Sequence, residues 1–202
     1  MAGTGPAIGT GGVQGAGPSL QDAGAAAADL YLSTGYMPLD GPRDAPKRSK
    51  PRYDRREIDA LVAYVASLGK GPPIPRIDPR LGSLSEGQAL FASNCAGCHQ
   101  VLAKGGVVLD GIAPDLKHAS PTQIAEAIRV GPYLMPRFTE RQLSDAQVAS
   151  LVRYVKYSQY PVDDGGWDLG HLGPIPEGAI AWLIAGIALV ALARFLGKRI
   201  GA

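Results

Sequence analysis

Residues 93–100 read SNCAGCHQ and contain both cysteines of the 202-residue chain. Cys95 and Cys98 stand at the spacing C-x-x-C, and His99 follows directly. At a helix end this spacing puts both sulfur atoms on one side, where they can reach one planar group, and the adjacent imidazole can stand perpendicular to it. The motif therefore predicts a covalently bound haem c, with thioether bonds from the two cysteines and His99 as the proximal ligand of the iron.

Other interpretations of the two cysteines stay open at this point. A zinc site needs further ligands, and only His118 and His171 are at hand, at no metal-ligand spacing. A redox dithiol of the thioredoxin type lies near a βαβ pattern, which the surrounding sequence lacks. Coincidence is the remaining alternative, since two cysteines cannot build a disulfide framework.

A haem iron also needs a sixth ligand or an open position. Met135 lies in the stretch LMPRF, and Pro136 favours an extended backbone at Met135, as in a loop that presents a thioether to iron. A lone methionine can also be core filler, but these polar surroundings are unusual for one. Met135 is therefore the predicted distal ligand, and a His/Met pair raises the reduction potential, which suits an electron carrier.

Helices are predicted around the motif from capping residues. Their starts are Asp54 with its partner Glu57, Ser85 with its partner Gln88, Ser120 before Pro121, and Ser144. A short helix over 21–33 precedes them. The helix from Asp54 carries an apolar face of Ile58, Leu61, Val62 and Val65.

Three stretches recur in the same order along the chain, which indicates an internal duplication. The pairs are GPSL (17–20) with APDL (113–116), GYMP (35–38) with YLMP (133–136), and IDALVAYV (58–65) with VASLVRYV (148–155). The first copy contains Met37 in a Met-Pro context but no cysteine.

The C-terminal stretch AIAWLIAGIALVALA (179–193) carries no charge. Extended through Leu196 it reaches roughly 27 Å, which predicts a transmembrane helix rather than the alternative, a buried core helix. Arg194, Lys198 and Arg199 lie at its end, whereas acidic residues precede it. The positive-inside rule then predicts a single-pass plasma-membrane protein with a cytoplasmic C-terminus and the haem domain outside.

Through the motifs GPSL, STGYMP, NCAGCH, APDL, LMPRF and LGPIPEG, the chain resembles the dihaem cytochrome c subunit of the actinobacterial-type cytochrome bc complex (quinol–cytochrome c reductase). The resemblance implies an all-α fold of tandem class I cytochrome c domains, the first incomplete, plus one C-terminal transmembrane helix. Pro114 is implied to take part in binding the haem. The implied divisions are a partial first domain (1–70), a linker (71–83), a haem domain (84–158), a connector (159–178) and the membrane helix (179–197).

The resemblance also implies electron transfer from the quinol-oxidising part of a bc complex to a terminal oxidase. The expected partners are the cytochrome b and iron–sulfur subunits, the oxidase and membrane lipid, and the chain is not expected to be catalytic alone. A net charge of +2 gives no sign of nucleic-acid binding. Alternatives are a haem c subunit of another respiratory complex, a monohaem membrane-anchored carrier, a haem enzyme, and a zinc-binding or structural membrane protein.

The first copy raises an expectation of its own. Met37 would be the ligand of a first haem whose attachment motif lies upstream of Met1, so one haem is expected in this chain and two in the full-length protein. The alternative is a monohaem protein whose first domain has decayed. Without an attachment helix to pack against, residues 1–53 are expected to be poorly ordered.

Overall fold

The computed structural model describes residues 20–39, 47–109, 111–161 and 174–200. The chain divides into two compact units, Met1–Pro161 and Val162–Ala202. The first unit contains the predicted haem motif, and the second contains the apolar C-terminal stretch. Each unit is described separately below.

The first unit is mostly helical, as the sequence predicts. Its helices are α1 (Gly24–Ser33), α2 (Arg55–Ser67), α3 (Leu84–Asn94), α4 (Ala96–His99), α5 (Pro121–Val130) and α6 (Asp145–Gln159), with a 3-10 turn η1 at Pro79–Leu81. An all-α fold is wrong in one detail, because the loop after His99 folds back as an antiparallel hairpin. Strand β1 (Gly106–Val108) pairs there with β2 (Gly111–Ala113).

Three of the predicted helix starts are confirmed as N-caps. Asp54, Ser120 and Ser144 each form a capping box with the residue three positions on. The fourth is wrong, because α3 is capped by Ser83, whose side chain accepts from the Glu86 N–H. A contact distant in sequence fixes this earlier start, since the Ser83 N–H donates to Ser150 Oγ over 2.9 Å.

Residues 84–158, which contain the predicted haem motif, are called the haem half below. Helices α3 and α6 form its core. A Cβ atom on Gly87 would lie 2.0 Å from the Ser150 carbonyl oxygen, so only glycine allows this close approach of the two helices. The rings of Phe91 and Tyr154 then lie 5.2 Å apart across the interface. The fully buried side chains of this core include Phe91, Val148, Leu151, Val152 and Val155.

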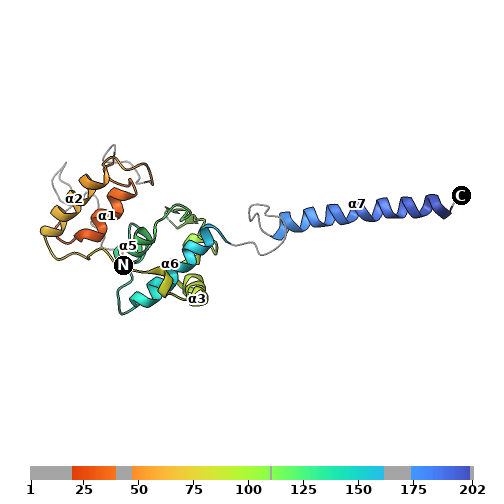
Figure 1. Cartoon of the computed structure of the whole chain (residues 1–202). Helices are drawn as coiled ribbons and strands as arrows, with labels where there is room; N and C mark the ends of the chain where they lie inside the picture. The colour runs from red at the N-terminus through yellow and green to blue at the C-terminus, as the bar shows by residue number, and fades with distance from the viewer. Residues whose placement is uncertain (1–19, 40–46, 110, 162–173, 201–202) are drawn as a thin grey trace. The chain divides into compact units, whose positions relative to one another are not determined.

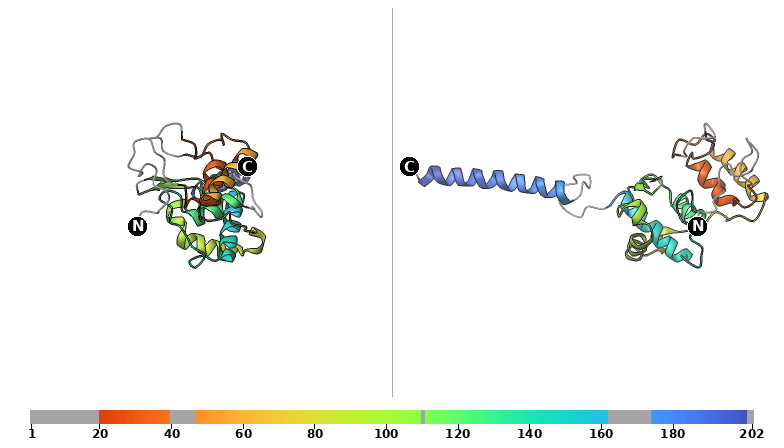
Figure 2. Two further views of the ribbon diagram at one scale, coloured as in Figure 1. Left: turned by 90° about the vertical axis from the view of Figure 1, so that its left-hand side faces the viewer. Right: turned by 180° about the vertical axis from the view of Figure 1, so that it is seen from behind.

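Helix α1 has a buried face, contrary to the expectation of poor order at residues 1–53. Ala26, Ala27 and Leu30 are at most 4% exposed. Figures 1 and 2 show α1 between α2 and α5, and contacts link it to both helices. Helix α5 belongs to the haem half, so α1 packs against a helix outside the first copy as well as against α2. Residues 1–19 and 40–46 lie outside the described residues.

The predicted linker and the loop that contains Arg48 both make contacts with other segments. The Ala26 N–H donates to the Pro72 carbonyl over 3.0 Å, which ties the predicted linker to α1. Arg48 donates to the His118 carbonyl at 2.9 Å and to Gln123 Oε1 at 2.8 Å. The Arg48 contacts join the first copy to the haem half.

Helix α2 differs from its sequence counterpart α6 on one face. Ile58, Val62 and Val65 are buried, as are their counterparts Val148, Val152 and Val155. Leu61 belongs to the apolar face that the sequence predicts, but it is 36% exposed, and Tyr64 is 61% exposed. Their counterparts Leu151 and Tyr154, only 1% and 6% exposed, are on α6, which packs against α3. Helix α1 contacts α2, but among the described residues no helix covers the face of α2 that contains Leu61 and Tyr64 in the way that α3 covers α6.

The second unit contains α7 (Pro174–Ile200), a single long helix. Residues Gly178–Lys198 form a stretch of 21 residues with a mean hydropathy of 2.3, none of it buried, which by length and composition can cross a membrane. The predicted span is confirmed to that extent, although the helix begins earlier than residue 179. Most of the predicted connector, residues 162–173, lies outside the described residues.

Candidate haem site

The C-x-x-C-H motif lies at the junction of α3 and α4. Cys95 ends α3, donating its N–H to the Phe91 carbonyl, and its own carbonyl accepts from the Cys98 and His99 N–H groups at 3.1 and 2.9 Å. This single turn brings both cysteines and the histidine onto one short segment. Cys95 is half-buried, Cys98 is exposed, and the two form no disulfide.

The state of Cys95 argues against a redox dithiol. Burial raises the pKa of its thiol to about 11, and the nearby Cys98 acts in the same direction. A reactive dithiol lowers the pKa of one cysteine instead. A zinc site also finds no support, because the described residues hold no group of three or more His, Cys, Asp and Glu side chains that could bind a metal ion.

His99 is held in one orientation by Pro114. Its ring is 9% exposed, and Nδ1 lies 3.1 Å from the Pro114 carbonyl oxygen. A carbonyl only accepts, so Nδ1 is the protonated nitrogen and Nε2 keeps its lone pair. Burial lowers the pKa of His99, against the smaller opposing effect of this hydrogen bond, so the ring is neutral at neutral pH. A neutral, oriented imidazole is what an iron ligand requires.

The hairpin explains why Pro114 reaches His99. Gly105 donates its N–H to the His99 carbonyl over 3.0 Å, with φ at +72°. A Cβ atom there would lie 2.4 Å from the Ala113 carbonyl oxygen, so this turn requires glycine. Pro114 follows β2 directly and is thereby returned to the motif. The sequence implied a role for Pro114 only through a resemblance, whereas the structure gives it a contact.

Met135 lies in the loop after α5 and packs half-buried against the same core as Cys95. Its N–H donates to the Pro132 carbonyl over 3.0 Å. Two further bonds tie the loop to α5, from the Phe138 N–H to the Ile128 carbonyl and from Arg129 to the Phe138 carbonyl. The thioether is therefore presented by an anchored loop and not by a free one.

The donor set fits a haem c. It comprises two unpaired thiols on one turn, an imidazole whose Nε2 has no competing partner among the described contacts, and a thioether against the same core. Large apolar side chains beside the motif are also exposed, such as Leu102 at 46% and Leu134 at 60%. A planar apolar group bound here would have apolar neighbours.

The loop that contains Met37 meets the loop that contains Met135, which the sequence did not predict. The Tyr133 ring lies 5.9 Å from Tyr31 and 6.1 Å from Tyr36 between ring centroids. Burial raises the pKa of all three phenols, which therefore stay neutral. Tyrosines close before both Met-Pro pairs were the available signal. Met37 itself is half-buried, and its N–H donates to the Tyr31 carbonyl.

Comparisons with known proteins show which family the chain belongs to. Residues 82–155 match the family model described as cytochrome c oxidase, cbb3-type, subunit III. The chain is 40% identical over 198 residues to the cytochrome bc1 complex cytochrome c subunit of Mycobacterium bovis, covering 93% of this chain and 70% of that protein. The protein of the same name from Corynebacterium diphtheriae is 35% identical over 208 residues, covering 93% and 73%. The one from Mycobacterium leprae is 37% identical over 197 residues, covering 93% and 68%.

The attachment residues give a direct prediction. Replacing both Cys95 and Cys98 by serine should abolish haem staining of the chain on a denaturing gel, because no other cysteine can form a thioether. Ser93→Ala, an exposed change on the end of α3, is the matched control and should keep the stain. A stain that survives the double change would refute covalent attachment at these residues.

Proposed function

Because the chain belongs to the cytochrome bc1 complex cytochrome c subunits, we propose that it is a membrane-anchored c-type cytochrome that passes electrons from the quinol-oxidising part of a respiratory bc complex to a terminal oxidase. Its partners in this proposal are the cytochrome b and iron–sulfur subunits and the oxidase. The chain alone catalyses no reaction and serves as a carrier within the assembly.

In this proposal each site residue has one role. Cys95 and Cys98 would hold the haem covalently, and His99 Nε2 and the Met135 sulfur would be the groups offered to its iron. Pro114 holds the imidazole through the 3.1 Å contact to Nδ1. A bound haem c supplies an iron that alternates between the ferric and ferrous states, and a Met/His pair keeps its potential high.

The observation that carries the proposal is the unequal burial of the motif. His99 is 9% exposed, whereas Cys98 is exposed. The ligand side is thus shielded from water, while the attachment side is open to a partner protein. A carrier that exchanges electrons without binding a substrate at the iron needs both features.

The membrane arrangement is supported by α7 and its flanking charges. Gly178–Lys198 is long and apolar enough to span a bilayer. Arg194 and Lys198 lie at its C-terminal end, so the positive-inside rule puts that end in the cytoplasm and the haem outside the plasma membrane. Trp182, 80% exposed, is then near the outer interface, where an aromatic side chain is favoured.

We also propose two haems for the native protein, with Met37 as a ligand of the first in a tandem cytochrome c arrangement. Residues 1–202 contain one C-x-x-C-H motif, so this chain holds one haem. The uncovered face of α2, with Leu61 36% and Tyr64 61% exposed, supports the arrangement, because α3 covers the matching face of α6. An attachment helix like α3 would fill this place.

A second candidate is a haem c subunit of an oxidase. The match of residues 82–155 to a cbb3-type subunit III model favours it. The greater coverage of this chain by the bc1 complex relatives, 93%, favours the first proposal.

The distal ligand can be tested by substitution. Met135→Ala should remove the near-infrared Met–iron absorption of the ferric protein and lower the reduction potential, because the thioether stabilises ferrous iron. Met37→Ala is the matched control in the other Met-Pro loop and should leave that absorption unchanged in the 202-residue chain. If Met135→Ala keeps the absorption, another residue ligates the iron.

The function can be tested on protein purified from native membranes with a tag on this chain. We expect the haem c of the preparation to be reduced by added quinol, with cytochrome b and iron–sulfur subunits present and two haems c per chain by pyridine haemochrome. Purification with oxidase subunits alone, and no reduction by quinol, would favour the second candidate. One haem c in a preparation active with quinol would overturn only the proposal of a second haem.

A further inference from the structure

An acidic pair is buried where α1 meets α5. Asp29 of α1 is 3% exposed and Glu126 of α5 is 0% exposed. Helices α1 and α5 contact each other, and the interaction of Asp29 with Glu126 raises the pKa of Glu126. Neither residue belongs to the haem site, and the two helices come from opposite halves of the first unit (Figure 1).

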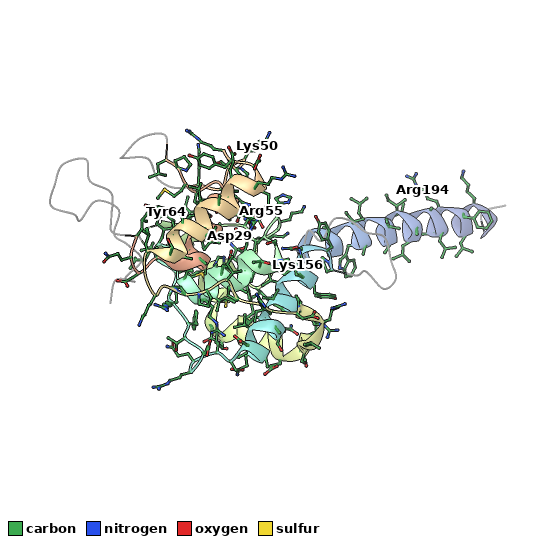
Figure 3. The ribbon with its side chains drawn as sticks, turned by 60° about the vertical axis from the view of Figure 1, so that its left-hand side comes forward. Asp29, Lys50, Arg55, Tyr64, Lys156 and Arg194 are labelled. Carbon is green, nitrogen blue, oxygen red and sulfur yellow. The ribbon has the colours of Figure 1, made fainter. Side chains whose placement is uncertain are left out.

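Among the residues that the structure describes, Arg55 is the cation that forms an ion pair with these carboxyl groups. Arg55, the first residue of α2, places Nη1 2.7 Å from Asp29 Oδ1, and Nη2 lies 2.7 Å from Asp59 Oδ1. Figure 3 shows Arg55 and Asp29 close together at α2. The Asp59 side chain is 57% exposed, so water shares its charge. Among the described residues, neither carboxyl oxygen of Glu126 has a hydrogen-bond donor.

The other cations around α5 are engaged elsewhere. Arg129, on α5 itself, lies 2.6 Å from Asp145 of α6 and donates to the Leu143 carbonyl. Lys156 of α6 donates to the Ala119 carbonyl. Arg48 donates to the His118 carbonyl and Gln123. Within the described part of the chain, the charges found at the pair are those of Asp29, Glu126 and Arg55, with Asp59 at the edge.

We propose that Asp29 and Glu126 form a proton-binding site, which holds one proton between the two carboxyl groups at neutral pH and thereby keeps α1 seated on α5. Asp29 is paired with Arg55 at 2.7 Å, and the neutral Glu126 donates its O–H to Asp29. An ionised Glu126 would be a fully buried carboxylate beside Asp29, with no hydrogen-bond donor to it among the described residues.

The direction of the pH dependence follows from this arrangement. Burial, the charge of Asp29 and the hydrogen bond to Asp29 raise the pKa of Glu126 to about 9, whereas the charge of Arg55 acts against them. When α1 leaves α5, water reaches Glu126 and its pKa returns toward 4.5. Opening therefore releases a proton, so the α1–α5 contact weakens as the pH rises from about 4.5 to about 9 and levels off above 9.

The site bears on the two methionine loops. Met37 follows α1 and Met135 follows α5, and the loops meet through Tyr31, Tyr36 and Tyr133. Loss of the proton weakens the helix contact on which this meeting depends. The seating of the two loops is thus tied to the pH of the compartment that the first unit faces.

Hydrogen exchange of the full haem-loaded chain in detergent tests the proposal. Between pH 6 and pH 8 the protection factors of α1 amides, corrected for intrinsic exchange, should fall by up to about tenfold per pH unit, because one proton is released on opening. Glu126→Gln should remove this slope, since an amide donates to Asp29 but does not titrate. The exposed Asp22→Asn, just before α1, is the matched control and should keep the slope.

Two further readouts keep the test independent of folding defects. The infrared absorption of a protonated carboxyl should be present at pH 7 in the parent chain and absent in Glu126→Gln. If that variant fails to load haem, Asp29→Asn serves instead, because Glu126 then pairs with Arg55, ionises, and the slope is again lost. Protection of α1 that does not change with pH in the parent chain, or an unchanged slope in both variants, would overturn the proposal.

Discussion

The hydrogen bond between His99 Nδ1 and the Pro114 carbonyl oxygen, at 3.1 Å, is the interaction that relates the haem motif to the rest of the fold. It requires the turn at α4, which presents the ring, and the β1–β2 hairpin, which returns Pro114. It also requires Gly105, whose backbone approaches the Ala113 carbonyl too closely for any side chain. A neutral imidazole with a free Nε2 results, and a c-type electron carrier is the function that this arrangement supports best.

Two sets of contacts stabilise the first unit, one within the haem half and one between its two halves. Within the haem half, α3 and α6 approach closely at Gly87 and bury the largest side chains of the core. Between the halves, α1 packs on α5, where Asp29 and Glu126 meet, and the tyrosines join the two methionine loops. The haem site is therefore a local structure, whereas the relation of the two loops depends on a contact that includes titratable groups.

The features that depend only on residues close together in the chain could be predicted from the sequence. The capping boxes at Asp54 and Ser120 and the apolar run of α7 could be read from neighbouring residues. The start of α3 could not, because Ser150, distant in sequence, determines it. The apolar face of α2 could be read from the sequence, whereas the extent to which Leu61 is exposed could not, because a repeated pattern does not reveal how neighbouring helices cover it. Asp29 left a signal, since it is a carboxylate within a mostly apolar helix, whereas Glu126 did not, because Thr122, Gln123 and Arg129 share its helix face.

The central claim is that His99 and Met135 hold one haem iron between them. The most direct test is a proton–carbon NMR spectrum of the reduced 202-residue chain with isotope-labelled methionine methyl groups. One of the three methyl signals, assigned to Met135 by substitution with leucine, should move far upfield, because a ligand on the iron lies within the ring current of the haem. The signals of Met1 and Met37 should stay near their ordinary positions. Three unshifted signals, or a shifted signal that belongs to Met37, would contradict the account.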